Sequence, residues 1–102
     1  RNRFRLLGLA GLVNGDCTSK FERKADLIAI ERGYGFGLIK YREWLYENIS
    51  DKQIIVKKRN YFTPEELELI IKVYEKDPSI MQGLEKNVPR NLDQVKAAVK
   101  NR

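Results

Sequence analysis

The four residues from Thr63 to Glu66 constrain the fold of this chain most, because they contain a complete start signal for a helix. Thr63 is a preferred N-cap residue, Pro64 suits the first helical position, and Glu66 completes a capping box. After this start, apolar residues recur at helical spacing as far as Tyr74. The sequence therefore predicts an amphipathic helix whose apolar stripe must be covered by other parts of the chain.

Two further helix starts follow. Asp77-Pro78 heads a helix of about two to three turns, which is too short to be stable without packing. Its expected buried positions are Ile80, Met81 and Leu84. Asn91 with Gln94 repeats the capping pattern at the head of a third helix. Residues 57–102 are thus predicted to form a unit of three helices preceded by a basic segment.

The third helix has an apolar face and an opposite polar face when its residues are placed at about 100° each. The apolar face consists of Leu92, Val95 and Val99, and the polar face of Gln94, Ala97 and Asn101, flanked by Lys100. Asparagine is suited to a bidentate hydrogen bond with adenine in the major groove, and lysine reaches guanine acceptors or phosphate. Small Ala97 allows the helix to approach closely. This pattern predicts a DNA-contacting helix.

The stretches FTPEEL, VYEKDP and QVKAAVKNR resemble a homeodomain, and the same region resembles a Myb/SANT repeat. The two families share a three-helix architecture. The resemblance implies that Arg59 acts as the minor-groove arginine of the homeodomain arm and Asn101 as the adenine-reading asparagine. It also places Phe62 in the core before the first helix and Lys100 at the position that sets specificity.

The chain departs from both families. The Trp-Phe pair of the third homeodomain helix is Ala98-Val99 here, and the region between the first and third helices is several residues short. The tryptophans typical of Myb repeats are missing as well. Residues 57–102 therefore resemble a divergent member of this group of folds.

The fold class that the sequence predicts is all-α, with six helices. Residues 1–51 are expected to form a helical unit that docks a protein partner, since the apolar run from Leu6 to Val13 predicts a helix that needs covering. Residues 52–56 are the predicted linker, where a β-prone Ile-Ile-Val run suggests extended chain. Residues 57–102 form the homeobox-like or Myb-like unit.

The amino-terminal half also carries specific expectations. Ser19 is expected to cap a helix that runs from about Lys20 to Arg32 and ends at Gly33, with Phe21, Ala25 and Ile28 as its apolar positions. In the following helix Arg42 is expected to face water and Trp44 to lie in the core, although Trp44 also suits an anchor for a partner protein. Tyr34 and Phe36 are expected to anchor the intervening turn in the core.

The net charge of +6 favours an acidic partner, and its distribution carries more information. Residues 1–51 carry nine basic and seven acidic groups, whereas residues 52–102 carry eleven and seven. The excess coincides with the predicted DNA-contacting parts. The predicted DNA-binding residues are Lys57, Lys58, Arg59, Arg90, Gln94, Lys96, Ala97, Lys100, Asn101 and Arg102.

The chain has no histidine and one cysteine, Cys17. Pairs of Ser and His or of Cys and His, an internal disulfide and a zinc constellation are therefore excluded by composition. We expect no catalysis and no cofactor. The apolar run near the start is too short to span a bilayer, so no membrane association is expected. A nuclear location is expected for a DNA-binding chain of this kind.

The predicted function is non-catalytic binding of double-stranded DNA, as a transcription regulator or as an accessory subunit of a chromatin- or DNA-modifying complex. Homeobox-like accessory subunits of a DNA adenine methyltransferase complex illustrate the second kind. The alternative is a SANT-like protein-interaction module. A third interpretation starts from LAGLVNGD, which resembles the LAGLIDADG motif of homing endonucleases, with Asp16 as the metal ligand; it requires β-strands after the motif.

Overall fold

The computed structural model describes residues 15–100, and all regular structure in that range is helical. The predicted all-α class is confirmed for these residues. The strands that the endonuclease interpretation requires do not occur among them. The predicted helix over the first 13 residues, together with Asn101 and Arg102, lies outside the described residues, as does the side chain of Asp16. The helices are α2 (Gly15–Glu31), α3 (Gly35–Asn48), α4 (Asp51–Asn60), α5 (Pro64–Lys76), α6 (Ile80–Lys86) and α7 (Leu92–Lys100).

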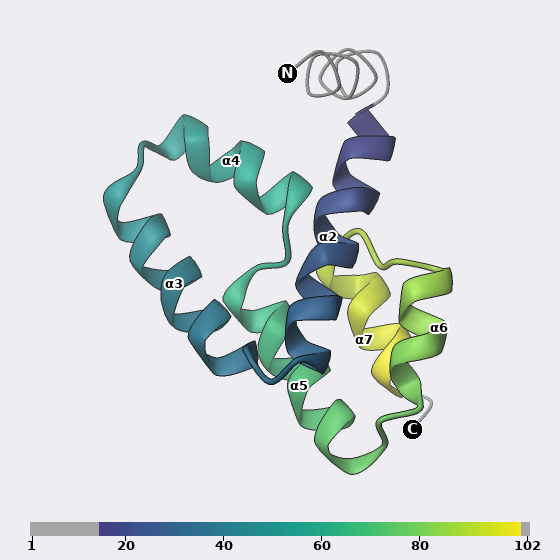
Figure 1. Cartoon of the computed structure of the whole chain (residues 1–102). Coiled ribbons are helices and arrows are strands. Elements are labelled where there is room, and N and C mark those ends of the chain that lie inside the picture. The colour runs from purple at the N-terminus through teal and green to yellow at the C-terminus, as the bar shows by residue number, and fades with distance from the viewer. Residues whose placement is uncertain (1–14, 101–102) are drawn as a thin grey trace, which may run out of the picture.

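Two helices organise the arrangement seen in Figure 1. α2 packs against α3, α4 and α6, while α5 packs against α3, α6 and α7. α3 and α6 therefore connect the two central helices, and α4 and α7 are each attached to one of them. One core cluster draws on both sides of the predicted linker, since it joins residues of α2 and α3 to residues of α5, α6 and α7.

The strongest start signal of the sequence is confirmed. Thr63 Oγ1 accepts a hydrogen bond from the Glu66 amide at 3.2 Å, and the Thr63 amide donates to Glu66 Oε1 at 2.8 Å. Phe62 and Leu67 are fully buried beside this start, on either side of the cap as in a hydrophobic staple. The apolar stripe of α5 faces the core, and the three predicted inward positions of α6, Ile80, Met81 and Leu84, are buried as well.

The extended conformation expected for residues 52–56 is wrong, because these residues and the basic residues after them form α4. A second capping box starts this helix: Ser50 Oγ accepts from the Gln53 amide at 3.2 Å, and the Ser50 amide donates to Gln53 Oε1 at 3.0 Å. The signal is present in the sequence, but the adjacent Ile-Ile-Val run favours a strand by propensity. A capped helix satisfies its own backbone groups, whereas an extended segment here has no strand to pair with among the described residues. No residue of α4 is buried.

The predicted inward positions of α2 are also wrong. This helix already includes Gly15, so Ser19 lies inside it and is buried instead of capping its start. The inward face carries Arg23, Asp26 and Leu27, whereas Phe21 is 66% exposed. The predicted stop is confirmed, since Gly33 has a positive φ of 90° immediately after the helix.

The aromatic residues expected in the core, Trp44, Tyr34 and Phe36, are exposed, contrary to the prediction. Trp44 is 56% exposed and stacks on Tyr41 with ring centroids 6.2 Å apart. Arg42, expected to face water, is buried instead. The reason is that the inward side of α3 accommodates an ion pair with α2, which turns Tyr41 and Trp44 towards solvent.

Candidate nucleic-acid interface

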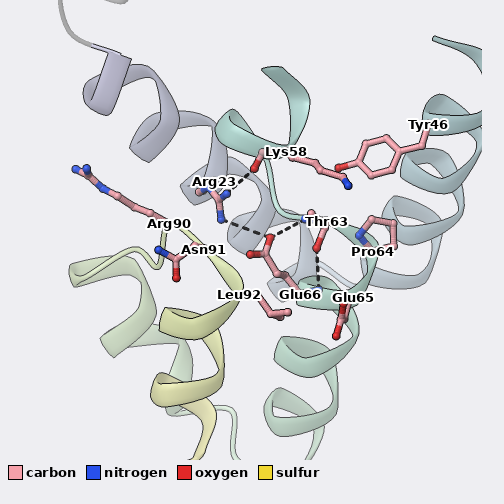
Figure 2. Close-up of a pocket in the computed structure, with 10 residues that line it drawn as sticks. All are labelled: Arg23, Tyr46, Lys58, Thr63, Pro64, Glu65, Glu66, Arg90, Asn91 and Leu92. Atoms are coloured by element: carbon pink, nitrogen blue, oxygen red, sulfur yellow. Dashed lines mark hydrogen bonds and ion pairs between the residues drawn. The ribbon is translucent and has the colours of Figure 1, made fainter. Parts of the chain in front are cut away.

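A buried arginine positions the segments that carry the predicted DNA-binding cations. Arg23 is 1% exposed, and its guanidinium donates to the carbonyls of Lys58 at 2.8 Å, Pro89 at 3.2 Å and Arg59 at 3.4 Å. It also forms an ion pair with Glu66 at 3.6 Å, as Figure 2 shows. Burial lowers the pKa of Arg23 from its ordinary value, although the neighbouring carboxylates oppose this shift. One side chain of α2 thus joins the end of α4, the start of α5 and the loop before α7.

A second buried arginine holds the corner between α4 and α5. Arg42 of α3 forms a bidentate pair with Asp26 of α2, with distances of 3.0 and 3.1 Å. Its Nη1 also donates to the Phe62 carbonyl at 2.6 Å, while Asp26 Oδ2 accepts from the Phe62 amide at 3.1 Å. Both backbone groups of Phe62 are therefore satisfied by the same ion pair, which fixes the entry of the chain into α5.

Tyr61 occupies the same corner and carries a shifted pKa. Its hydroxyl donates to Glu22 Oε2 at 2.5 Å. Desolvation, together with this hydrogen bond, raises the pKa of Tyr61 to about 12. Because the folded pKa lies above the ordinary value of 10.0, the protonated hydroxyl stabilises the fold.

We therefore expect an alkaline loss of stability that depends on Tyr61. Its contribution is fully present below about pH 10 and is lost as the pH rises through about 12. Urea unfolding of the parent and of Tyr61→Phe, measured at about pH 9 and about pH 11, tests this expectation. The parent should lose more free energy of unfolding between the two pH values than the variant. Equal losses of unfolding free energy in the parent and the variant would show that Tyr61 does not ionise on unfolding in this pH range.

α7 presents the two faces that the sequence predicts. Val95 is fully buried and packs in the core, with Leu92, Ala98 and Val99 half-buried around it. Gln94, Lys96, Ala97 and Lys100 are exposed. The exposed face is therefore polar and cationic around a small residue, apart from Asp93 in its first turn.

The start of α7 uses one of the predicted DNA-binding residues for the fold itself. Asn91 Oδ1 accepts from the Gln94 amide at 2.9 Å, which confirms the predicted cap. Gln94 Oε1 accepts in turn from the Arg90 amide at 2.8 Å. The side-chain carbonyl of Gln94 is thereby occupied, so its amide nitrogen is the group that remains to donate to a ligand.

The predicted basic arm is the last turn of α4. Lys58 and Arg59 are exposed, and their backbone carbonyls accept from Arg23. Ser19 Oγ also donates to the Arg59 carbonyl, at 2.8 Å. Lys57 lies with its Nζ 5.0 Å from the centroid of the Tyr61 ring. An arm of the homeodomain type is extended and enters the minor groove, so this helical segment does not correspond to it.

A cationic hollow lies at the start of α7. It has a volume of about 300 Å³ and is lined by Lys20, Lys86, Asn87, Val88, Arg90 and Gln94. Three of these residues are basic and none is acidic. They come from α2, from the last turn of α6 and from the loop before α7, so folding assembles them from distant parts of the chain. Of the cations, only Arg90 belongs to the predicted set.

A second hollow, of about 470 Å³, is drawn in Figure 2 and has a mixed charge. Lys58 and Arg23 contribute to its lining, but so do Glu65 and Glu66. Figure 2 shows the Arg90 side chain extending away from these glutamates. The mixed lining makes this hollow a poorer place for a phosphate than the cationic one.

Groups of His, Cys, Asp or Glu suited to a metal ion do not occur within residues 15–100. The helices of this range also include none long and apolar enough to cross a membrane. Comparison of the sequence with protein-family models and curated proteins, and of the fold with solved structures, finds no match. The function must therefore be inferred from the residues of this chain alone.

Proposed function

We propose that this chain binds double-stranded DNA without catalysing a reaction on it, as a regulator or as an accessory subunit of a DNA- or chromatin-modifying complex. The observation that carries the proposal is the cationic hollow, where Lys20, Lys86 and Arg90 converge beside the first turn of α7. A hollow whose lining includes three basic residues and no acidic one is suited to the phosphates of a nucleic-acid backbone.

The exposed face of α7 supports the same proposal. Lys96 and Lys100 flank the small side chain of Ala97, so the helix can approach the floor of a major groove closely. In this arrangement the hollow contacts phosphates at one side of the groove while α7 faces the bases. Lys58 and Arg59 at the end of α4 add charge along the flanking backbone.

We expect single cation removals to weaken binding to every duplex alike. Lys86→Ala and Arg90→Ala should each reduce the slope of log affinity against log salt concentration by about one unit, because each phosphate contact releases condensed counterions. Lys40→Ala, on the exposed side of α3, is the matched control and should leave the slope unchanged. Titration of each variant with duplexes at two salt concentrations measures its affinity and the slope of that affinity with salt.

The same titration distinguishes recognition of bases by Asn101 from sequence-independent contacts with phosphates. Asn101→Ala should reduce the binding free energy for one duplex by about 1–3 kcal/mol, and by less for duplexes that differ from it at a single base pair. Equal losses on every duplex would refute base reading by Asn101. An absence of binding at low salt would refute the DNA proposal as a whole.

A second candidate function is a protein-interaction module, as Myb/SANT-like folds suggest. The observation that favours it is the exposed, stacked pair of Tyr41 and Trp44 on α3, since aromatic side chains are enriched in protein interfaces. The exposed α3 aromatics and the cationic hollow lie on different elements, so the two functions can be tested separately.

A further inference from the structure

α4 carries an apolar groove that the proposed DNA surface does not use. The groove has a volume of about 540 Å³ and is lined by Ile49, Lys52, Gln53, Ile55, Val56 and Lys57. Ile55 is 67% exposed and Val56 is 43% exposed, which is unusual for β-branched apolar residues in a small helical protein. α4 packs mainly on α2 and contributes no buried residue, so its outer side is open to a partner.

The spacing of the lining residues fits a helix as the occupant. Within α4, Gln53 lies three residues before Val56 and four before Lys57, which places these residues along one side of the helix, while Ile49 closes the groove just before the N-cap Ser50. A partner helix laid along such a stripe makes contacts at every turn, as in the recognition of amphipathic helices by apolar grooves. Aromatic side chains of α3 do not line the groove, so its floor is aliphatic.

The charge of α4 selects among possible occupants. The helix carries Lys52, Lys57, Lys58 and Arg59 against a single acidic residue, Asp51. A second copy of this chain would place the same cations against one another, which disfavours self-association. A DNA backbone matches the lysines but leaves Ile55 and Val56 without an apolar partner. An occupant with both an apolar stripe and acidic flanks satisfies all of these groups.

We propose that the α4 groove binds an acidic amphipathic helix of a partner protein. The apolar residues of that helix cover Ile55 and Val56, while its carboxylates face Lys52 and Lys57 at the rim. This inference goes beyond DNA binding and does not depend on it, because the groove and the cationic hollow share no residue.

The test uses a fluorescent peptide of about 16 residues, long enough for measurable helicity, with leucines at helical spacing and glutamates elsewhere. Fluorescence polarisation with the full chain measures its affinity. We expect Val56→Ser to weaken binding at least about tenfold, because the buried valine methyls are lost. Lys52→Glu should weaken it about fivefold and reduce its salt dependence. Tyr34→Ser, an exposed aromatic residue on a different element, is the matched control and should leave the affinity unchanged.

Three outcomes would overturn the proposal. The first is equal binding of a peptide with the same composition in scrambled order, or of one with lysines in place of the glutamates. The second is unchanged affinity in Val56→Ser, whose fold circular dichroism confirms. The third is a chain that does not bind the peptide but instead binds anionic vesicles, or self-associates in sedimentation in a way that Val56→Ser abolishes. Duplex titration of Val56→Ser keeps the two proposals separate, since its DNA affinity should equal that of the parent.

Discussion

Replacing Arg23 with methionine should destabilise the fold by about 3–5 kcal/mol and lower the midpoint of thermal unfolding by more than about 10 °C. Methionine fills part of the same space but cannot donate hydrogen bonds. The carbonyls of Lys58 and Pro89 then lose the donor that Arg23 supplies, while the Arg59 carbonyl keeps only Ser19. Glu66 remains beside them without its counter-charge. Unsatisfied buried groups of this kind account for the largest single-residue losses.

Arg32→Met is the matched control for this experiment, because Arg32 is exposed directly after α2. It should change the free energy of unfolding by less than about 0.5 kcal/mol. Urea unfolding followed by circular dichroism measures both variants. A loss below about 1 kcal/mol in Arg23→Met would show that the three carbonyls find other donors, and the proposed role of Arg23 would then be untenable.

Removal of the carboxylate of Asp26 is the second change for which a large effect is expected. Asp26→Ala leaves Arg42 buried without its counter-charge and deprives the Phe62 amide of its acceptor. The expected loss is again about 3–5 kcal/mol, because breaking a buried ion pair leaves an uncompensated charge. Glu43→Ala, at an exposed position beside Arg42 in the sequence, is the matched control and should be nearly neutral.

A double-mutant cycle tests whether Asp26 and Arg42 act as a pair. Asp26→Ala combined with Arg42→Met should cost at least about 1 kcal/mol less than the sum of the two single changes, since the second substitution removes the charge that the first leaves unpaired. Strict additivity would indicate that each residue stabilises the fold through other contacts.

The capping signals predicted the fold best. The capping box at Thr63 and the side-chain cap at Asn91 head α5 and α7, because a cap depends only on residues a few positions apart. The capping box at Ser50 precedes residues of high β propensity, so the sequence carries two conflicting signals there. Local hydrogen bonding outweighed propensity there, since a strand depends on a partner strand for stability and a helix does not.

The buried charges were the main obstacle to predicting the core. Periodicity arguments place charged residues in water, so Arg42 was assigned to the surface and Trp44 to the core. The structure reverses both, because Asp26 compensates Arg42 from a different helix. Pairing between residues far apart in sequence leaves no periodic signal in either helix.

The candidate site was predicted only in part for a similar reason. The faces of α7 follow from its own period, but Lys20 and Lys86 reach Arg90 only through the packing of α2 and α6 around the loop before α7. No local pattern links three positions that are so distant along the chain. The glutamine at the start of α7 illustrates the reverse case, in which a residue of suitable chemistry is engaged by the fold.

The three carbonyls that share Arg23 have a consequence for recognition. They belong to two segments that carry surface cations, one at the end of α4 and one before α7, about 30 positions apart. Because both segments are attached to one rigid group, the spacing between their charges is set before any ligand arrives. An anionic partner of matching geometry therefore meets a preorganised array, and little conformational entropy is lost when it binds.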